Sequence, residues 1–294
     1  PGRHLFGGWL RPHFGHFLME STPRLWAFDE LSDEIDSVVY IPFRNGSQKA
    51  RDQYGPFLDL FTGGKPVNIL SDPTRVEELI VPDPGFGHGT RITGSPRYRS
   101  LSRSRINAEI TPSGPERLYI SRTKLKDRRG GVFGENHIEA LMEADGYTIF
   151  HPQKFALKEQ LAHYAAAREI VCLDGSALHM AAYALRPGAR IGMIYRRRAS
   201  VLDDIVRQLK VFADTEVVCF DALRNYWIDE TARRVNYKSI GELDLPELQA
   251  KLQDAGFIGK QPVMQDLTTA DITGIIAGLD RGAMRPVAVD PDKN

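Results

Sequence analysis

The strongest constraint on this chain is a regular alternation of short apolar segments and longer amphipathic segments between residues 117 and 195. The apolar segments are short and rich in β-branched and aromatic residues, which predicts strands. We expect strands over 117–121, 147–150, 169–173 and 189–195, and helices over 135–145, 157–168 and 176–185. This succession predicts a parallel, Rossmann-like sheet covered by helices on both faces.

A less regular α/β pattern precedes this unit. We expect strands over 37–42, 66–70 and 76–82, and helices over 14–31 and 49–61. Pro23 should bend or restart the first helix, because proline removes a backbone hydrogen bond. The segment TPSGPE (111–116) is dense in turn formers and predicts a linker. We therefore expect an N-terminal α/β domain over 1–113 and a Rossmann-like domain over 114–222.

The last part of the chain carries weaker patterns. We expect a helix over 199–213, a strand over 217–220, and helices over 244–257 and 268–280. The final residues, MRPVAVDPDKN, are typical of a frayed tail. Residues 223–294 are accordingly predicted to form a helical extension that packs back on the body.

Composition argues against several functions. The chain has 294 residues with 38 Lys and Arg and 38 Asp and Glu, so its formal net charge is zero. Bulk charge therefore does not draw it to nucleic acid or to anionic membranes. Cys172 and Cys219 both lie in apolar runs, which argues against a disulfide framework or a cysteine-based zinc site.

Targeting signals are also missing from the sequence. It contains no run of eighteen apolar residues and no signal-peptide pattern, so we expect a soluble chain. It begins at Pro1 without a methionine, which suggests that a longer native protein has been trimmed or renumbered, and whether an N-terminal extension or an anchor is missing stays open.

The stretch CLDGSALHMAAY (172–183) places Gly175 and Ser176 between a predicted strand and a predicted helix. Ligands of α/β proteins bind at the carboxyl ends of parallel strands, and free N–H groups at a helix start attract anions. The turn can therefore be a phosphate cradle, or a corner in which Ser176 caps the helix. A serine nucleophile is disfavoured, because the nucleophile elbow G-x-S-x-G requires one residue between glycine and serine, and Leu178 replaces its second glycine.

A basic loop follows the predicted strand over 117–121. Five cations fall within eight residues: Arg122, Lys124, Lys126, Arg128 and Arg129. Guanidinium groups bind phosphate oxygens in a bidentate manner, so the loop suits a polyanionic ligand. A solvated basic loop explains the same charges. Nucleic acid is disfavoured, because the loop lacks interleaved aromatic side chains that stack on bases.

His16, Glu20 and Arg24 recur at four-residue spacing and should project along one face of the first helix. A histidine beside a carboxylate can act as a general base, or the carboxylate itself can take the proton. The spacing is equally typical of a surface ion pair between Glu20 and Arg24. A metal site that includes His13 is disfavoured, because the order is not H-E-x-x-H and no further ligand cluster is apparent.

Three motifs together resemble the family 61 glycosyltransferases, which include bacterial proteins of capsular polysaccharide biosynthesis. They are HFGHFLMESTPRLWAF near the N-terminus, YISR (119–122) followed by GEN (134–136), and DGSALHMAAY (174–183). Family members show an analogous histidine-containing helix with a downstream P-R-L, a Y-I-S-R strand end, an N-E pair and a similar turn, in the same order. The resemblance covers about residues 3–195.

The resemblance implies a GT-B architecture, in which two Rossmann-like domains face a central cleft, and an inverting transfer from a nucleotide sugar. It implies donor contacts from the second domain: Arg122, Lys126, Arg128, Glu135, Gly175, Ser176, Ala177 and His179. It places His16 and Glu20 in the cleft as catalytic residues, with Glu20 ranked first as proton acceptor. His13 and Arg24 are expected on the acceptor side. The role of Glu135 stays open, because GEN stands where members often have N-E.

We therefore expect a metal-independent, inverting glycosyltransferase that moves a sugar from a UDP-sugar to a saccharide acceptor in capsular or surface polysaccharide assembly. No cofactor is expected, because the only Asp-x-Asp triplet, at 290–292, lies in the predicted tail. The expected location is cytoplasmic, with peripheral association with the polysaccharide machinery of the membrane. Two alternatives are a non-catalytic nucleotide- or glycan-binding module and a serine hydrolase. The hydrolase is disfavoured, because Ser176 and His179 lie on one helix, whereas a triad histidine normally comes from a separate loop.

Overall fold

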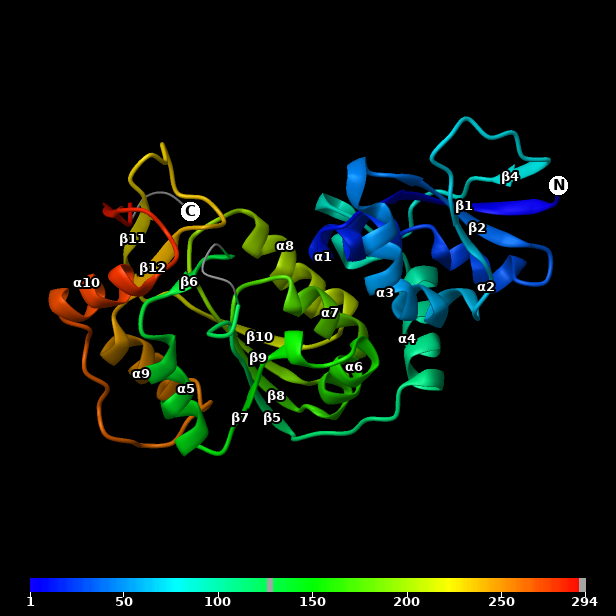
Figure 1. Cartoon of the computed structure of the whole chain (residues 1–294). Helices are drawn as coiled ribbons and strands as arrows, with labels where there is room; N and C mark the ends of the chain where they lie inside the picture. Colours follow the sequence, from blue (N-terminus) through cyan, green and yellow to red (C-terminus); the bar gives the residue numbers. More distant parts are fainter. Residues whose placement is uncertain (126–128, 291–294) are drawn as a thin grey trace.

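A computed structural model describes residues 1–125 and 129–290 of the chain and shows a mixed α/β fold with three sheets (Figure 1). The first sheet lies near the N-terminus and has the strand order β3-β2-β1-β4, with all neighbours parallel. Its strands are β1 (Arg3–Leu10), β2 (Ser37–Pro42), β3 (Val67–Ile69) and β4 (Glu78–Ile80). The central strand β1 was not expected from the sequence, whereas the other three lie where they were predicted.

The predicted helix over 14–31 is divided into short pieces. They are α1 (Phe14–His16), a π-helical turn (Phe17–Ser21), a 3₁₀ turn (Leu25–Ala27) and α2 (Phe28–Leu31). The Thr22 hydroxyl donates to the Leu18 carbonyl at 2.7 Å, and Pro23 follows it. The expected restart at Pro23 is therefore present, and the backbone turns between the π-helical turn and the 3₁₀ turn. Two longer helices, α3 (Ser47–Thr62) and α4 (Pro96–Glu109), complete this region.

The central sheet follows the predicted β-α-β succession and is parallel throughout, with the order β10-β9-β8-β5-β7. Its strands are β5 (Arg117–Ile120), β7 (Thr148–Phe150), β8 (Glu169–Leu173), β9 (Arg190–Ile194) and β10 (Glu216–Phe220). Its connecting helices are α5 (Glu135–Ala144), α6 (Leu157–Ala166), α7 (Ala177–Ala184) and α8 (Val201–Arg207), and a π-helical turn (Gln208–Phe212) continues α8. The chain moves outward from β5 in both directions, so the topological switch point lies between β5 and β8.

Alternate residues of the central strands serve two different cores. Leu118 belongs to a large buried cluster that also contains Phe17 and Phe57 of the N-terminal region, whereas Tyr119 belongs to the cluster beneath α5. Tyr183 of α7 packs edge-on against Phe57 at 5.2 Å between ring centroids. The first and central sheets are therefore joined through one continuous apolar core.

The third sheet has the order β13-β11-β12-β6 and corrects two expectations for the C-terminal part. Its strands are β6 (Gly131–Val132), β11 (Leu223–Asp229), β12 (Ile240–Leu243) and β13 (Met284–Ala288), accompanied by α9 (Leu245–Asp254) and α10 (Thr269–Gly278). Residues 223–290 are thus not a purely helical extension. Nor is residue range 284–288 a frayed tail, because β13 pairs antiparallel with β11, which supplies its backbone hydrogen-bond partners.

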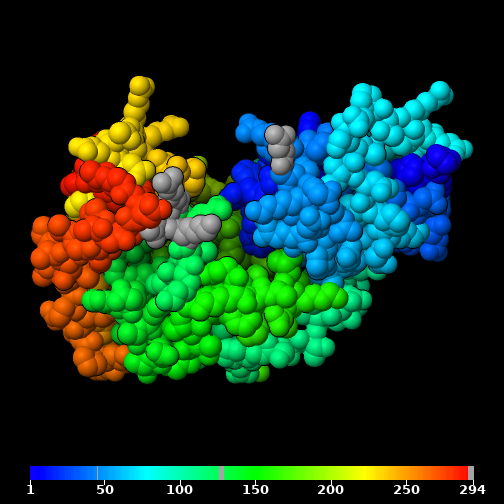
Figure 2. All heavy atoms as spheres, in the orientation of Figure 1, coloured from blue at the N-terminus to red at the C-terminus, as the bar shows by residue number. Residues whose placement is uncertain are grey.

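The surface is hollowed between the two ends of the chain. Figure 2 shows a notch that separates the blue N-terminal residues from the yellow and red C-terminal residues, with green residues at its floor. Among the helices that the structure describes, none combines the length and the apolar character needed to cross a membrane.

Candidate functional site

The YISR and DGS motifs meet at the switch point of the central sheet. Strands β5 and β8 are direct neighbours, with Ile120 opposite Cys172, so the residues that follow them emerge at the same edge. Arg122 Nη1 lies 2.8 Å from the position that a Cβ on Gly175 would occupy. A side chain at position 175 would therefore require this guanidinium group to move, and the two motifs meet at the place where α/β sheets bind ligands.

The described residues bind one nitrogen of the Arg122 guanidinium and leave another nitrogen without a partner. Its Nη2 donates to the carbonyl oxygens of Arg129 and Gly130, at 2.8 and 3.2 Å. Its Nε is buried and has no hydrogen-bond partner among the residues that the structure describes. Burial, followed by the charge of Arg196, lowers the pKa of Arg122 to about 10. This site therefore holds a cation with an unused donor.

A buried ion pair lies beside Arg122. The Asp174 carboxylate accepts hydrogen bonds from the Arg196 backbone N–H at 2.9 Å and forms an ion pair with the Arg196 guanidinium at 3.1 Å. Their side chains are 2% and 7% exposed. A Cβ on Gly130 would lie 2.9 Å from Arg196 Nη1. Arg196 was missed from the sequence, although the run of three arginines after a predicted strand was a signal for it.

Glu135 begins α5 and holds the backbone of Arg122. Its Oε1 accepts from the Arg122 N–H at 2.7 Å and from the Tyr119 hydroxyl at 3.3 Å. Glu135 is 5% exposed, and burial raises its pKa to about 7. Glu135 thus positions the strand end that carries Arg122, and its predicted contact with the donor stays a prediction.

The turn before α7 contains Gly175 and Ser176, which were predicted to contact the donor. Ser176 occupies the N-cap position, but its side chain makes no capping hydrogen bond, so the capped-corner reading does not hold. His179, in the first turn, is 8% exposed, and its Nδ1 lies 2.5 Å from Gln208 Oε1. Burial lowers the pKa of His179. Nδ1 of this histidine is thus engaged by Gln208 of the π-helical turn that follows α8.

Two of the predicted donor contacts, Lys126 and Arg128, lie outside the described residues. Ala177 is the first residue of α7, so its backbone N–H is free of intrahelical partners.

A second cluster forms around Glu20 in the π-helical turn, a type of turn that is common at functional sites. His16 Nδ1 lies 2.5 Å and His88 Nε2 lies 3.2 Å from Glu20 Oε1, and Arg11 Nε lies 2.6 Å from Oε2. Burial alone would raise the pKa of Glu20, but the hydrogen bonds from Arg11, His16 and His88 outweigh it and lower this pKa to about 2. Arg11 and His88 were missed from the sequence.

Arg24 does not share this cluster. Its Nε donates to the Pro82 carbonyl at 3.1 Å, and its guanidinium lies over the Phe6 ring. The predicted face of His16, Glu20 and Arg24 is therefore wrong beyond Glu20, because the backbone turns at residues 22–24 before Arg24 is reached.

His13 flanks the cluster, and its ring centroid lies 5.2 Å from that of His16. Burial, followed by the charges of His16 and Arg129, lowers the pKa of His13.

The Glu20 cluster includes a set of atoms that could ligate a metal. One atom each from His16, Glu20 and His88 lies within 4.8 Å of the others. His88 thus supplies the third ligand that the sequence did not indicate. Arg11 binds the other oxygen of this carboxylate, Oε2, so a metal ion held by these atoms would lie near a guanidinium charge.

The Glu20 cluster and the site around Arg122 lie next to each other, with Gly15 at the contact. A Cβ on Gly15 would lie 3.3 Å from Ser176 Cβ, so α1 packs directly against the turn before α7. Figure 1 shows α1 next to the central sheet's helices in the same way. The helix that leads into the Glu20 cluster thus contacts the turn that lies beside Arg122.

The sequence model of the glycosyltransferase 61 family matches residues 14–192. This range covers more than half of the chain and includes His16, Glu20, Arg122 and Gly175, whereas Arg11 and Arg196 lie outside it. The chain belongs to the glycosyltransferase 61 family. This glycosyltransferase acts between a sugar donor and an acceptor, as its family membership implies. No curated protein matches it in sequence.

Proposed function

We propose that this glycosyltransferase is an inverting, metal-independent enzyme of GT-B layout that transfers a sugar from a nucleotide donor, which we take to be a UDP-sugar, to a hydroxyl group of a saccharide. The observation that carries the proposal is the contact between Gly15 and Ser176, which brings the Glu20 cluster to the edge that bears Arg122. An inverting transfer needs a base on one side of the anomeric carbon and a site for the departing diphosphate on the other.

The geometry favours His16 over Glu20 as the base. Glu20, with a pKa of about 2, is a weak proton acceptor. Because a carboxylate only accepts hydrogen bonds, the neutral form of His16 carries its hydrogen on Nδ1 and has a lone pair on Nε2. The His16 side chain is 50% exposed, so that lone pair can reach a substrate. Glu20 then orients His16, which reverses the ranking drawn from the sequence.

The donor side stabilises the leaving group. As the acceptor oxygen bonds to the anomeric carbon, His16 Nε2 takes its proton, and the bond from that carbon to the diphosphate oxygen breaks with its electron pair. The departing nucleoside diphosphate is an anion. Arg122 and the free N–H groups at the start of α7 are placed to bind it.

The acceptor and the setting complete the proposal. His13 lies beside His16 and is proposed to contact the acceptor, whereas Arg24 could contact only an acceptor that extends toward Pro82. We propose a role in capsular or surface polysaccharide assembly, in the cytoplasm and peripherally attached to the membrane machinery. The support is the resemblance of the three motifs to bacterial family members.

Calorimetry with UDP and a UDP-release assay with a panel of UDP-sugars test this function. We expect UDP binding, a loss of affinity in Arg122→Ala, and slow UDP release that falls about 100-fold or more in His16→Ala and in Glu20→Gln. His137→Ala, an exposed histidine on α5, is the matched control and should retain full activity. UDP binding without UDP release would favour the non-catalytic binding module. Full activity in both base variants would refute the base assignment.

A further inference from the structure

Three consecutive arginines follow β9, and each has a different environment. The Arg196 guanidinium is paired with the Asp174 carboxylate. Arg198 forms an ion pair with Asp221 at 2.7 Å and donates to the Asp290 carbonyl at 2.8 Å. Arg197 has no hydrogen bond or ion pair to any residue in 1–125 or 129–290, and its Nε is buried. Of the three, Arg197 is therefore the one whose guanidinium N–H groups have no partner among the described residues. These groups are left for a ligand.

Among the residues that the structure describes, no carboxylate pairs with Arg197 to balance its charge. Burial, followed by the repulsion of Arg196, lowers the pKa of Arg197, and Asp174 opposes this shift. Asp174, however, is already paired with Arg196. A partly buried guanidinium without a counterion is unfavourable unless a bound anion compensates it.

Arg122 shows the same condition at the same edge of the sheet. Its Nε is likewise buried without a partner among the described residues, and Arg196 and Asp174 are likewise its leading charged neighbours. Arg122 follows β5 and Arg197 follows β9, and β8 lies between these strands. The two guanidinium groups whose Nε has no partner among the described residues thus come from the strands on either side of the turn at Gly175.

We propose that Arg197 is a second anion-binding residue of the donor site and that it clamps, together with Arg122, the diphosphate of the nucleotide sugar. The planar guanidinium donates two parallel hydrogen bonds that match phosphate oxygens, and two such groups suit a diphosphate better than a single phosphate. This inference rests on the proposed function. It assigns the Asp174 and Arg196 pair the role of holding the turn in place between the two clamping groups.

Calorimetry with inorganic pyrophosphate, UDP and uridine on the full chain tests the assignment. We expect Arg197→Gln to bind pyrophosphate and UDP roughly 10- to 100-fold more weakly, because a charge-assisted hydrogen bond to each phosphate is lost. Uridine affinity should not change. Arg198→Gln is the matched control from the same run, and it should bind all three probes as the native chain does, because Arg198 is satisfied within the protein.

Thermal unfolding without ligand keeps the test decisive. Removal of an uncompensated cation should leave the melting temperature of Arg197→Gln unchanged or raised, and Arg197→Lys should fold equally well while binding pyrophosphate more weakly than the native chain. Unchanged pyrophosphate affinity in Arg197→Gln, or an equal loss in Arg198→Gln, would overturn the inference. If the native chain binds pyrophosphate through Arg197 but does not bind UDP, the anion site stands and the nucleotide donor of the proposed function fails.

Discussion

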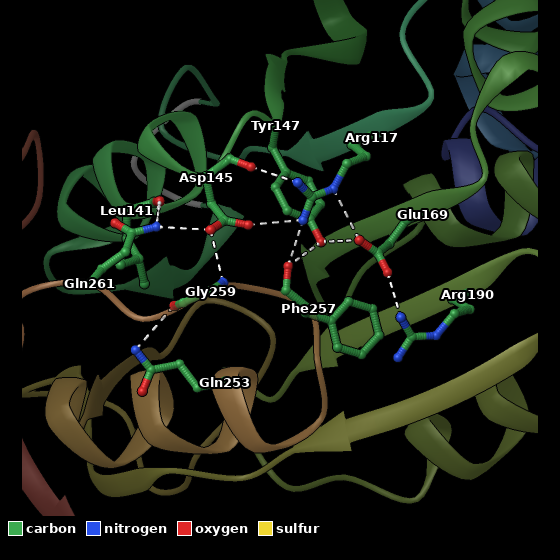
Figure 3. Close-up of polar contacts among 10 residues, drawn as sticks. All are labelled: Arg117, Leu141, Asp145, Tyr147, Glu169, Arg190, Gln253, Phe257, Gly259 and Gln261. Carbon is green, nitrogen blue, oxygen red and sulfur yellow. Dashed lines mark hydrogen bonds and ion pairs between the residues drawn. The ribbon is translucent and has the colours of Figure 1, made fainter.

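The amino ends of the central strands form one edge of the central sheet, the amino edge, and their carboxyl ends form the other, the carboxyl edge. Both edges carry arginines and carboxylates, but these side chains are paired differently. At the amino edge, Glu169 lies between Arg117 and Arg190 on neighbouring strands and accepts from both, at 3.1 and 2.7 Å. Figure 3 shows this network and its continuation to the Phe257 carbonyl. At the carboxyl edge, Arg122 and Arg197 keep buried donors without partners in the described residues. The arginines of the amino edge are thus paired within the protein, whereas those of the carboxyl edge keep donors for the ligand that we propose.

The pKa of a carboxyl group is shifted in opposite directions at the two edges. At the amino edge, burial would raise the pKa of Asp145, but hydrogen bonds from the Gly259 N–H and from Arg117 outweigh it and lower this pKa. At the carboxyl edge, burial prevails and raises the pKa of Glu135 to about 7. Paired charges thus stabilise the amino edge, whereas at the carboxyl edge the buried Glu135 carboxyl group lowers stability as it ionises.

The largest effect is expected from Glu169→Ala at the amino edge. The substitution removes an acceptor shared by Arg117, Arg190 and the Tyr147 hydroxyl, the last at 2.6 Å. The free energy of unfolding should fall by about 3–4 kcal/mol, the lower part of the range for a broken buried ion pair, because both arginines are about one third exposed. Urea denaturation at pH 7 measures this change.

The control for Glu169 is Glu216→Ala. Glu216 pairs with Arg190 at 3.8 Å but is 61% exposed, so its loss should change stability by about 0.5 kcal/mol or less. UDP affinity measured in the folded Glu169→Ala protein should equal that of the native chain. A large loss of UDP affinity there would show that the two edges are not separate in function.

A smaller effect is expected from Glu135→Gln at the carboxyl edge. Because the folded-state pKa of Glu135 is raised from 4.5 to about 7, its contribution to stability is fully present below pH 4.5 and is lost as the pH rises through 7. The native chain should therefore lose about 2–3 kcal/mol of stability across this window relative to Glu135→Gln. The glutamine retains an oxygen for the Arg122 N–H.

Chemical denaturation at pH 4.5 and pH 8 checks this slope. Glu143→Gln, an exposed residue on the same helix, should run parallel to the native chain. Parallel curves for Glu135→Gln and the native chain would mean that Glu135 is ionised in the folded protein throughout, and that the carboxyl edge is better compensated than its burial indicates.

Much of the central sheet could be predicted from the sequence, because parallel strands buried on both faces leave continuous apolar runs. Strand β1 could not, because its glycines are typical of a loop. Yet a Cβ on Gly7 would clash with the Tyr40 ring of the neighbouring strand, so glycine is required there by packing. Strand β13 was missed for a related reason, since its pairing with β11 is a tertiary contact.

The site was predicted where it depends on strand ends and missed where it depends on loops. Arg122 and Gly175 follow apolar strands that are visible in the sequence. Arg11 follows the unpredicted β1, and His88 lies in a segment rich in glycine and proline that shows no periodicity. Periodicity also could not indicate which of three adjacent arginines remains unpaired, because that depends on the partners Asp174 and Asp221.

The smallest effect is expected from Asp145→Asn at the amino edge. Its carboxylate lies 2.9 Å from Arg117 Nη2 and accepts from the Gly259 N–H at 2.8 Å. The asparagine oxygen can keep the second contact, so only the ion pair is lost, and about 1 kcal/mol of stability should be lost with it at pH 7.

Because the folded-state pKa of Asp145 is lowered, this contribution is present above the ordinary pKa of 3.8 and is lost as the pH falls below it. The native and Asp145→Asn unfolding curves should therefore converge in acid, opposite to the Glu135 pair, with Asp72→Asn in an exposed loop as control. A gap that persists in acid would assign the effect of Asp145 to packing and not to charge, which would remove the electrostatic contrast between the two edges.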